Sequence, residues 1–592
     1  MLAQSFGAFN AGLFAGLLVG APVAQSVAAS ASAPSVALVL VLGAYLLPLL
    51  LFWDIAGQLA DKYEKARLAR ILKALEIPVM TAAGIAVILH SQMLLLCAVA
   101  LFSMLLTLFT PLKHAIVSAH LREEELVSSN VLLVAGTVLG FFAGALGGGA
   151  LAIESGRIGW LSFVCGTPAI FGYVASKGVP AAPASDPGLR LGFNFVAGAA
   201  WHVGSSSRER TSYLSLLAIA WFWISMALFL YSSWWSVDAV SAGKEQWLVS
   251  AAALSAGVCA GLLLGDKLCA GHAEFGWLPV AAIGQAVLAL DLAFLAQPGS
   301  SPAWRGQFDL FVLGASGGLL LPTLYVHIQS CGEAKRRARM ASFGLFLGAA
   351  TGLPIAWVLM WASPGSASVL SFVAVCCFLL ALFAYRLEAH LTLRFLTWLL
   401  IHAFYRVEKN GFEHIPRTGP AVLVCNHVSF VDSVVIMAAI RRPIRFVMDH
   451  RIHQTPVVGF IFRHSRTIPI ATAKEDPAMK ESAFAEVARA LRNGELIGLF
   501  PEGRITHTGE INHFRYGVGR IVEETPVPVV PMALRGLWGS FFSRRYGPAM
   551  SKPMLLRWLA KVELVVGQPV QPERGTPEYL QEVVTDLRGG MV

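Results

Sequence analysis

The stretch "LVCNHVSFVDS", residues 423–433, decides how the last third of the chain is expected to fold. A short apolar run breaks off just before His427, and Asp432 follows five residues later. Ser429 and Asp432 have the spacing of a capping box, which favours the start of a helix. A strand that ends where a helix begins lies at the sheet edge where α/β folds bind ligands. The stretch therefore predicts either a helix cap that contains a histidine or the general base of an enzyme.

A second polar motif follows another apolar run downstream. It is "LFPEGRIT", residues 499–506, in which the rigid Pro501 precedes Glu502, Gly503 and Arg504. A glycine in a tight loop lets the backbone approach a ligand closely, and arginine suits bidentate binding of phosphate. A third apolar run, "VPVVPMALRG", is a further strand that ends near the same edge. These strand ends together predict one ligand site.

Short β-rich runs alternate with helical patterns from residue 406 onward. The expected strands are 421–425, 444–448, 467–471, 496–500, 528–534 and 561–566, and the expected helices are 431–440, 477–493, 516–524 and 576–588. Alternation of this kind favours a layered α/β domain.

The preceding part of the chain has the composition of a membrane protein. Of the 592 residues, 56% are hydrophobic and 14% are charged, which is outside the soluble globular range. Apolar runs of roughly 20 residues recur up to about residue 387, and each can cross a hydrocarbon core of ~30 Å. We expect twelve spans, at 6–26, 35–56, 75–91, 93–111, 129–153, 157–178, 213–233, 246–265, 278–297, 306–329, 342–361 and 366–387.

The loops between these spans alternate between nearly uncharged and basic segments. The positive-inside rule places the basic loops, both chain ends and the region after residue 390 in the cytoplasm. The formal net charge of +9 favours anionic lipid or an acidic carrier as the partner, and nucleic acid is not expected. The eight cysteines are scattered without metal-ligand spacing, so no metal site is expected.

The two halves of the membrane region form a weak repeat. "PLKHAIVSAHLREEELVSSN" and "PTLYVHIQSCGEAKRRARMAS" each follow the fourth span of a half. Together with "GQLADKYEKARLAR", residues 57–70, this pattern resembles the major facilitator superfamily, whose halves rock about a midplane site. "GAFNAGLF" and the two loops of the first half resemble the lysophospholipid transporters of that superfamily, although Ala11 stands where those proteins usually carry an acidic residue. The resemblance implies a transporter gate or lipid path at Asn10, Asp54, Gly57, Asp61 and Lys113.

"NHVSFVD" and "FPEGR", in this order and at this separation, resemble the glycerolipid acyltransferases, the family of lysophosphatidate acyltransferases, over about residues 406–570. The resemblance implies acyl transfer from a thioester to a lipid hydroxyl, with His427 as general base and Asp432 holding the imidazole in one tautomer. Arg504 is expected to hold the lipid phosphate beside that base. The residues expected to bind substrate are Asn426, Ser429, Phe500, Pro501, Glu502, Gly503, Arg504, Arg466, Lys474 and Pro531. Arg544 and Arg545, beside "LWGSFF", are expected to form an aromatic and basic lip at the membrane surface.

The whole chain resembles bacterial fusions of a lysophospholipid transporter with an acyltransferase. The expected fold is an all-α major facilitator unit followed by an α/β domain. Its expected parts are a six-span half at 1–178, a linker at 179–212, a second half at 213–387, an amphipathic connector at 388–405, and an acyltransferase domain at 406–592. A plain continuation of the twelfth span is the alternative for the connector.

The leading hypothesis is transport and reacylation of lysophospholipid at a bacterial inner membrane. The acyl donor is expected to be acyl-CoA or acyl carrier protein, with no bound cofactor, and phospholipid is the product. One alternative is an acyltransferase whose membrane half only binds and anchors lipid. The other is a lysolipid transporter whose C-terminal domain senses lipid without catalysis.

Overall fold

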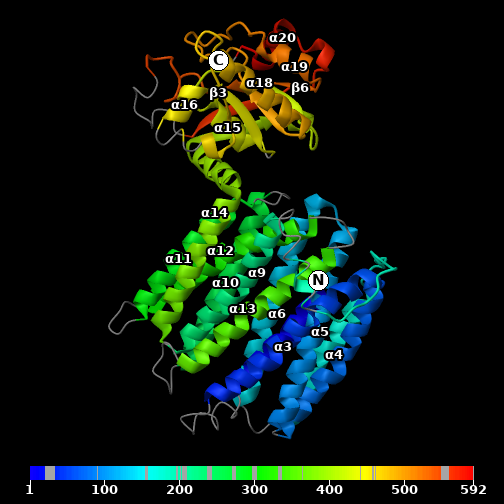
Figure 1. Cartoon of the computed structure of the whole chain (residues 1–592). Helices are drawn as coiled ribbons and strands as arrows, with labels where there is room; N and C mark the ends of the chain where they lie inside the picture. The colour runs from blue at the N-terminus through cyan, green and yellow to red at the C-terminus, as the bar shows by residue number, and fades with distance from the viewer. Residues whose placement is uncertain are drawn as a thin grey trace. The chain divides into compact units, whose positions relative to one another are not determined.

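The computed structural model of the chain describes most of the sequence. The described residues are 1–20, 34–89, 91–153, 158–194, 196, 198–200, 202, 210–235, 243–269, 275–296, 303–330, 337–362, 365–440, 442–455, 459, 462–548 and 559–590. The chain divides into two compact units, Met1–Leu387 and Glu388–Val592. The first is helical and the second combines helices with a sheet (Figure 1).

The first unit is built from long helices. They are α1 (Leu2–Gly20), α3 (Pro34–Lys62), α4 (Lys65–Ile88), α5 (Gln92–His120), α6 (Glu123–Ile153), α7 (Ile158–Lys177), α9 (Arg210–Trp235), α10 (Gly243–Cys269), α11 (Trp277–Leu295), α12 (Ala303–Ser330), α13 (Arg337–Ala362) and α14 (Ser366–Phe404). Each expected span overlaps one of these helices. Residues 21–26 of the first span, 90 of the third, 157 of the sixth and 297 of the ninth lie outside the described residues. Within the described part of the chain, ten helices, all of these except α1 and α7, are long and apolar enough to cross a membrane.

One helix differs from the expectation in a way that bears on function. α4 begins at Lys65, well before the expected span at 75–91, because the side chain of Glu64 caps it by accepting from the N–H groups of Ala66 and Arg67. The basic segment expected in a loop is therefore helical. α14 is kinked, with non-helical backbone at Glu388, the first residue of the expected connector and of the second unit.

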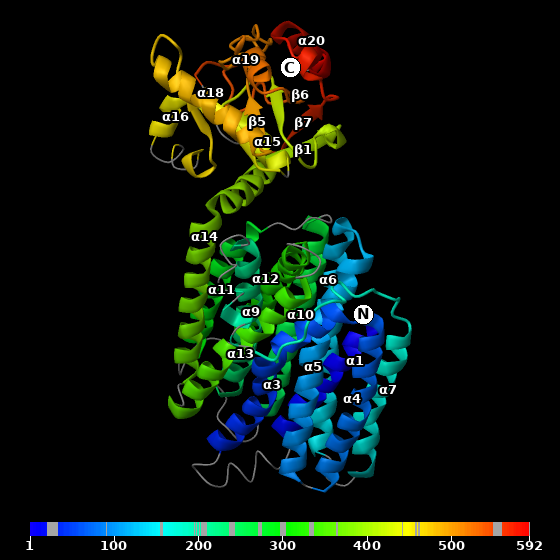
Figure 2. The same ribbon diagram turned by 45° about the vertical axis from the view of Figure 1, so that its right-hand side comes forward.

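Close helix packing organises the first unit. α1 packs along α6, and α4 packs against α5 and α7 (Figure 2). Glycines allow the first contact, because a Cβ at Gly140 or Gly144 of α6 would meet the carbonyl oxygens of Ser5 and Phe9 in α1. The two halves meet where α3 packs against α13 and where α6 packs against α10 and α12.

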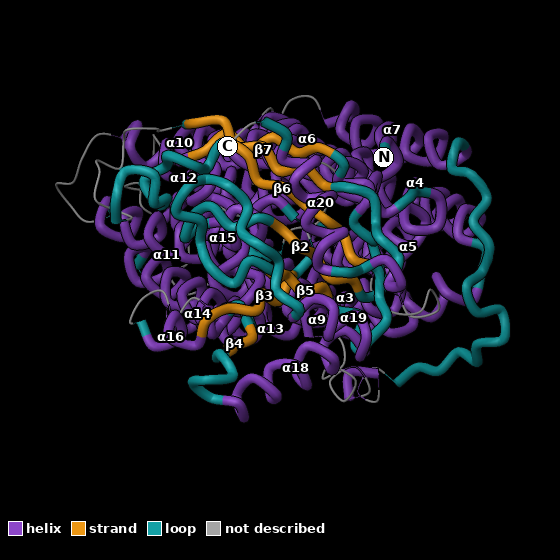
Figure 3. Tube along the Cα trace, turned by 90° about the horizontal axis from the view of Figure 1, so that it is seen from above, coloured by secondary structure: helices purple, strands orange, loops and turns teal. Residues whose placement is uncertain are grey.

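The second unit is a layered α/β domain, as the alternation in the sequence predicts. Its strands are β1 (Tyr405–Asn410), β2 (Ala421–Cys425), β3 (Ile444–Asp449), β4 (Ile468–Ile470), β5 (Leu496–Leu499), β6 (Val529–Arg535) and β7 (Ala560–Val566). They form one sheet in the order β1-β7-β6-β2-β5-β3-β4, with β6 and β7 antiparallel and the other neighbours parallel. Figure 3 labels the strands from β7 to β4. β1 is the strand that the sequence analysis missed.

Helices cover both faces of this sheet. They are α15 (Asp432–Ala439), α16 (His450–Gln454), α18 (Pro477–Arg492), α19 (Gly517–Glu524) and α20 (Pro577–Arg588), with short 3-10 turns at Phe412–His414 and Pro572–Arg574. Alternate residues of β2 point to opposite faces. Leu423 and Cys425 pack in the core that contains α15, whereas Val422 and Val424 pack in the core that contains α18, α19 and α20. β2 is thus buried on both sides, and the residues after Cys425 emerge at the carboxyl edge of the sheet.

Candidate active site

His427 and Asp432 lie together in the turn between β2 and α15. Nδ1 of His427 is 2.8 Å from Oδ2 of Asp432. The same oxygen accepts from the backbone N–H groups of Val428 and Ser429, at 2.7 and 2.9 Å. The Asp432 side chain is 0% exposed and that of His427 is 20% exposed. One buried carboxylate therefore fixes both the turn and the orientation of an accessible imidazole.

The structure does not show the helix cap that the opening stretch offers as one interpretation. The N-cap residue of α15 is Val431, whose side chain forms no cap hydrogen bond, and Asp432 is the first residue of the helix. The Asp432 carboxylate accepts from the N–H groups of Val428 and Ser429, which precede the helix, and the hydroxyl of Ser429 accepts from the N–H of Val431 at 3.1 Å. The same carboxylate thus holds the turn before α15 and the imidazole of His427.

An aromatic stack supports the imidazole ring. The rings of His427 and Phe500 are stacked with centroids 4.2 Å apart and planes 13° apart, and Phe500 stacks in turn on Phe446 of β3. Phe500 directly follows β5, the strand next to β2. The Phe500 ring therefore also positions His427, because the stack limits how far the imidazole can tilt.

Glu502 ties the two motifs together. Its Oε1 accepts from the backbone N–H of His427 at 2.7 Å, and its Oε2 accepts from the backbone N–H and the side-chain amide of Asn512, both at 2.7 Å. Thr506 also donates its N–H to the carbonyl oxygen of His427. Burial raises the pKa of Glu502, and the hydrogen bonds from Asn512 and His427 oppose that shift. The loop thus sets the position of the candidate base through the backbone.

Arg504 lies exposed on this loop and is connected to the same network. Its Nη2 donates to the amide oxygen of Asn512 at 3.1 Å. The preceding Gly503 has φ +63, a left-handed conformation that favours glycine, and a Cβ there would lie 2.9 Å from the guanidinium of Arg515. Sequence reasoning missed Asn512, which joins Glu502 to Arg504 and carries no motif of its own.

Asn426 and Pro531 belong to the sheet. The side chain of Asn426 is buried and forms two hydrogen bonds with the backbone of Leu534 in β6. Its amide nitrogen donates to the Leu534 carbonyl at 3.1 Å, and its amide oxygen accepts from the Leu534 N–H at 2.8 Å. Pro531 is buried in β6 opposite Val424, and its carbonyl accepts from the N–H of Gly567. Both residues are therefore buried parts of the sheet, whereas the sequence predicts that they contact substrate.

Arg466 is not brought to the candidate site. It precedes β4 and donates to Glu495, which precedes β5, at 2.9 Å. Because β4, β3, β5 and β2 are parallel, residues before β4 and β5 lie at the edge opposite the one where His427 follows β2. Lys474 is exposed and follows β4, so of the two expected cations it is the one at the carboxyl edge of the sheet, the same edge as His427.

A loop after β6 lies against the turn that carries His427. Ser429 forms a bridge with Ser543, and the N–H of Phe430 donates to the carbonyl of Phe542 at 3.2 Å. The guanidinium of Arg544 lies 5.4 Å from the ring centre of Phe430. It also bonds to Nε2 of His507 at 2.8 Å. The expected aromatic and basic lip is thus positioned by direct contact with the candidate site.

Comparison with known proteins agrees with this arrangement. A family model described as Acyltransferase matches residues 406–535, which include both motifs. Residues 406–535 form an acyltransferase domain. A curated relative, the chloroplastic 1-acyl-sn-glycerol-3-phosphate acyltransferase of Arabidopsis thaliana, is 28% identical to the chain over 137 residues, which make up 23% of this chain and 38% of the relative. The chain therefore spans less than two thirds of that relative's length.

Solved structures align with each part of the chain. The 1-acyl-sn-glycerophosphate acyltransferase of Thermotoga maritima aligns with 34% of this chain and 79% of its own, at 23% identity and a TM-score of 0.28. The fucose:proton symporter of E. coli, a major facilitator protein, aligns with 65% of this chain and 97% of its own, at 14% identity and a TM-score of 0.48. The ten described helices that are long and apolar enough to cross a membrane make the part of the chain before the acyltransferase domain a multi-pass membrane unit, independently of these alignments.

Of the residues expected to form the transporter gate or lipid path, Asp61 and Gly57 lie where the two halves of the membrane unit meet. Asp61 of α3 accepts from Nε of Arg339 of α13 at 3.2 Å, and Gly57 packs so closely on α13 that a Cβ there would lie 2.7 Å from the Cα of Arg339. These two residues therefore join the halves. Asp54 accepts from Gln58 one turn along α3 at 2.9 Å, and Lys113 is half-buried in α5.

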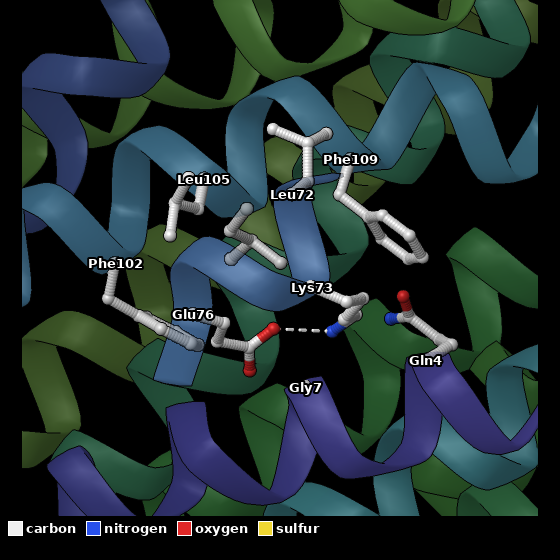
Figure 4. A pocket seen from close by; sticks show the side chains of 9 residues that line it. Gln4, Gly7, Leu72, Lys73, Glu76, Phe102, Leu105 and Phe109 are labelled. Atoms are coloured by element: carbon white, nitrogen blue, oxygen red, sulfur yellow. Dashed lines mark hydrogen bonds and ion pairs between the residues drawn. The ribbon is translucent and has the colours of Figure 1, made fainter. Parts of the chain in front are cut away.

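Asn10 belongs to a different cluster, in the first half of the unit. Its amide nitrogen donates to Glu76 of α4 at 2.7 Å, and Glu76 pairs with Lys73 at the pocket shown in Figure 4. Sequence reasoning missed both charged residues, because it placed Lys73 in a cytoplasmic loop and did not single out Glu76 within the expected span at 75–91. The signal that could have found them is their spacing of three residues, which puts them on one face of a helix.

Proposed function

We propose that the acyltransferase domain transfers a fatty acyl group from an acyl thioester to the free glycerol hydroxyl of a lysophospholipid. The observation that carries this proposal is the contact of 2.8 Å between His427 Nδ1 and the buried Asp432, on a ring that keeps 20% of its side chain exposed. Since Nδ1 is engaged, Nε2 is the nitrogen left to accept the hydroxyl proton. Nucleophile, base and orienting acid then follow the logic of a serine-protease triad, with the lipid hydroxyl in place of serine.

The reaction balances without a covalent enzyme intermediate. His427 takes the hydroxyl proton while the hydroxyl oxygen bonds to the thioester carbonyl carbon. Collapse of the resulting tetrahedral species breaks the carbon–sulfur bond. The imidazolium then gives its proton to the departing thiolate, which leaves phospholipid and a free thiol. Asp432 stabilises the positive charge on the imidazolium between these two steps.

Arg504 would hold the lipid phosphate and so fix the glycerol hydroxyl near His427. Its bond to Asn512 supports this assignment, because Asn512 also donates to Glu502, which sets the His427 backbone. The donor would be acyl-CoA or acyl carrier protein. We place the domain and both chain ends in the cytoplasm of a bacterium, at its inner membrane, because the basic loops favour that side.

Acyl transfer by the purified full chain tests the enzyme assignment. The assay would supply labelled acyl-CoA or acyl carrier protein and a lysophospholipid in detergent. We expect His427→Ala to lower kcat by about 10²–10⁴-fold. The matched control is His414→Ala, because that imidazole bonds to the Val566 carbonyl away from both motifs. An unchanged rate in His427→Ala would reject the mechanism.

The membrane unit would move lysophospholipid to the leaflet where the domain acts. Flipping of a fluorescent lysophospholipid by the full chain in proteoliposomes tests this part independently. Acyl transfer without flipping would favour the alternative in which the membrane unit binds and anchors lipid. Flipping with no acyl transfer under any donor would favour a transporter with a lipid-sensing domain.

A further inference from the structure

A second arginine lies beside the loop that carries Arg504. The backbone N–H of Arg515 donates to the carbonyl oxygen of Pro501 at 2.9 Å, so the segment after Asn512 folds back on this loop. The neighbouring Phe514 is 1% exposed and packs in the core that contains α18, α19 and α20, whereas Arg515 is exposed. The buried ring thus anchors the segment next to the loop and leaves the guanidinium outside.

The guanidinium of Arg515 packs on Gly503. A Cβ at position 503 would lie 2.9 Å from Cζ, 2.9 Å from Nε and 3.0 Å from Nη1 of Arg515. These three distances are nearly equal, so Gly503 meets the face of the planar group and not its N–H edge. Arg504 directly follows Gly503, and its guanidinium bonds to Asn512, three residues before Arg515. Both guanidiniums therefore belong to one small patch of the surface.

Neither guanidinium has a carboxylate partner among the residues that the structure describes. Glu502, the acidic residue of the same loop, is 2% exposed, and its two oxygens accept N–H groups of His427 and Asn512. Two like charges on one patch repel each other, and an anion bound between them removes that repulsion. Arginines elsewhere in the domain pair with glutamates, as in Arg445–Glu486, Arg466–Glu495 and Arg520–Glu481. The patch thus lacks the negative charge that a ligand can supply.

We propose that Arg515 is a second phosphate-binding residue, which holds the phosphate of the acyl acceptor together with Arg504. The inference rests on the proposed function, because it concerns the same lipid phosphate. The phosphodiester of a lysophospholipid has two non-bridging oxygens, and each guanidinium fork can donate to one of them. The phosphate does not react, so this contact is the same before and during acyl transfer. Arg515 therefore contributes to substrate affinity and not to the rate of the bound complex.

Steady-state kinetics of the purified full chain in detergent test this assignment. The acceptors are a lysophosphatidate and a lysophosphatidylethanolamine of one chain length, each varied at saturating acyl donor. We expect Arg515→Gln to raise KM for both acceptors by about tenfold or more, because a hydrogen bond between charged groups contributes that much. We expect kcat to stay within a few fold of the parent chain. The rise should be larger for lysophosphatidate, whose phosphomonoester carries up to two negative charges.

The conservative variant Arg515→Lys separates binding from a structural role. It keeps the positive charge and loses the planar fork, so its acceptor KM should lie between those of the parent chain and Arg515→Gln. Both variants should unfold at the temperature of the parent chain, because the side chain is exposed. If Arg515→Gln fails to fold, Arg515→Lys decides, and an acceptor KM equal to that of the parent chain would then count against the site.

The matched control is Arg492→Gln. Arg492 is also exposed and also lacks a carboxylate partner within the described part of the chain, but it ends α18 and precedes β5, at the sheet edge opposite His427. It should keep the parent KM for both acceptors. An unchanged acceptor KM in Arg515→Gln would overturn the proposal. A raised KM for the acyl donor alone would also overturn it, because the guanidinium would then belong to the phosphate of the donor.

Equilibrium binding separates this inference from the proposed function. A parent chain that transfers no acyl group from any donor would reject the proposed enzyme. Binding of a short-chain lysophosphatidate to the parent and Arg515→Gln chains would still test the site, since the membrane unit is the same in both. A loss of affinity of about tenfold or more in Arg515→Gln would support the site, and equal affinity would reject it.

Discussion

Replacing Asp432 by asparagine tests the hydrogen bonds on which the candidate active site depends. In the parent chain Oδ2 accepts three donors, from the His427 ring and from the N–H groups of Val428 and Ser429, at 2.7–2.9 Å. Oδ1 is buried and has no partner among the described residues. In Asp432→Asn the amide oxygen must take the place of Oδ2, because the amide nitrogen there would face three donors.

The expected magnitudes follow from that geometry. Bonds to a charged acceptor contribute about 1.5–3 kcal/mol and bonds to a neutral one about 1 kcal/mol, so three bonds weaken together. The amide nitrogen then fills the Oδ1 position as a buried, unpaired donor, while release of a buried charge offsets part of the loss. We expect the free energy of unfolding to fall by about 1–3 kcal/mol. The transition state additionally loses the negative partner of the imidazolium, and we expect kcat to fall by about 10²–10⁴-fold.

The assay compares kcat for acyl transfer with thermal unfolding of the purified full chain. Asp476→Asn is the matched control, because Asp476 is another carboxylate at a helix start that accepts a backbone N–H: it caps α18 by accepting from Met479. It should lose no more than about 1 kcal/mol of stability and keep its rate. If Asp432→Asn kept kcat within a few fold of the parent chain, the carboxylate would have no part in stabilising the imidazolium.

Three further substitutions test the loop and the pH response. Glu502→Gln puts a side-chain NH₂ opposite either the His427 N–H or the N–H groups of Asn512, so one pair of donors faces each other. We expect this clash to displace His427 and lower kcat about 10²-fold, with KM for lysolipid little changed. Gly503→Ala forces a left-handed residue against Arg515, and chemical denaturation should record a loss of about 1–2 kcal/mol. Burial lowers the pKa of His453, so the folded chain binds fewer protons there than the unfolded chain, and stability falls as the pH drops below the ordinary value of 6.5. His453→Gln should flatten stability over that window, and a slope equal to that of the parent chain would contradict this cause.

Local sequence patterns predict most of the strands and helices of the second unit. The expected strands at 421–425 and 496–500 are β2 and β5 almost to the residue, because apolar runs of strand length ended by polar motifs leave few alternatives. β1 was missed for the opposite reason. "YRVEKN" directly follows a helix, alternates weakly, and becomes a strand through pairing with β7, which local sequence does not record.

Contacts between distant segments explain the other misses. Arg466 was assigned to the site from its neighbourhood in sequence, but its place before β4 puts it at the opposite edge of a parallel sheet. Asn512 matters through Glu502 and Arg504, which depends on how a loop folds back. The sequence predicts a loop at Lys73 because the basic run before it interrupts the apolar pattern, whereas α4 already begins at Lys65. The catalytic roles of His427 and Asp432 stay predictions, although their side chains lie as the motif predicts.

The pairing of β1 with β7 has a consequence for how the chain is made. β7 is the neighbour of β1 in the sheet, yet it is the last strand to leave the ribosome, whereas β1 is the first. A nascent chain therefore holds an unpaired strand edge throughout synthesis of the domain, and such edges promote aggregation. A message cut short before β7 would release a protein with its membrane helices already made and that edge still open, so we expect the product to aggregate.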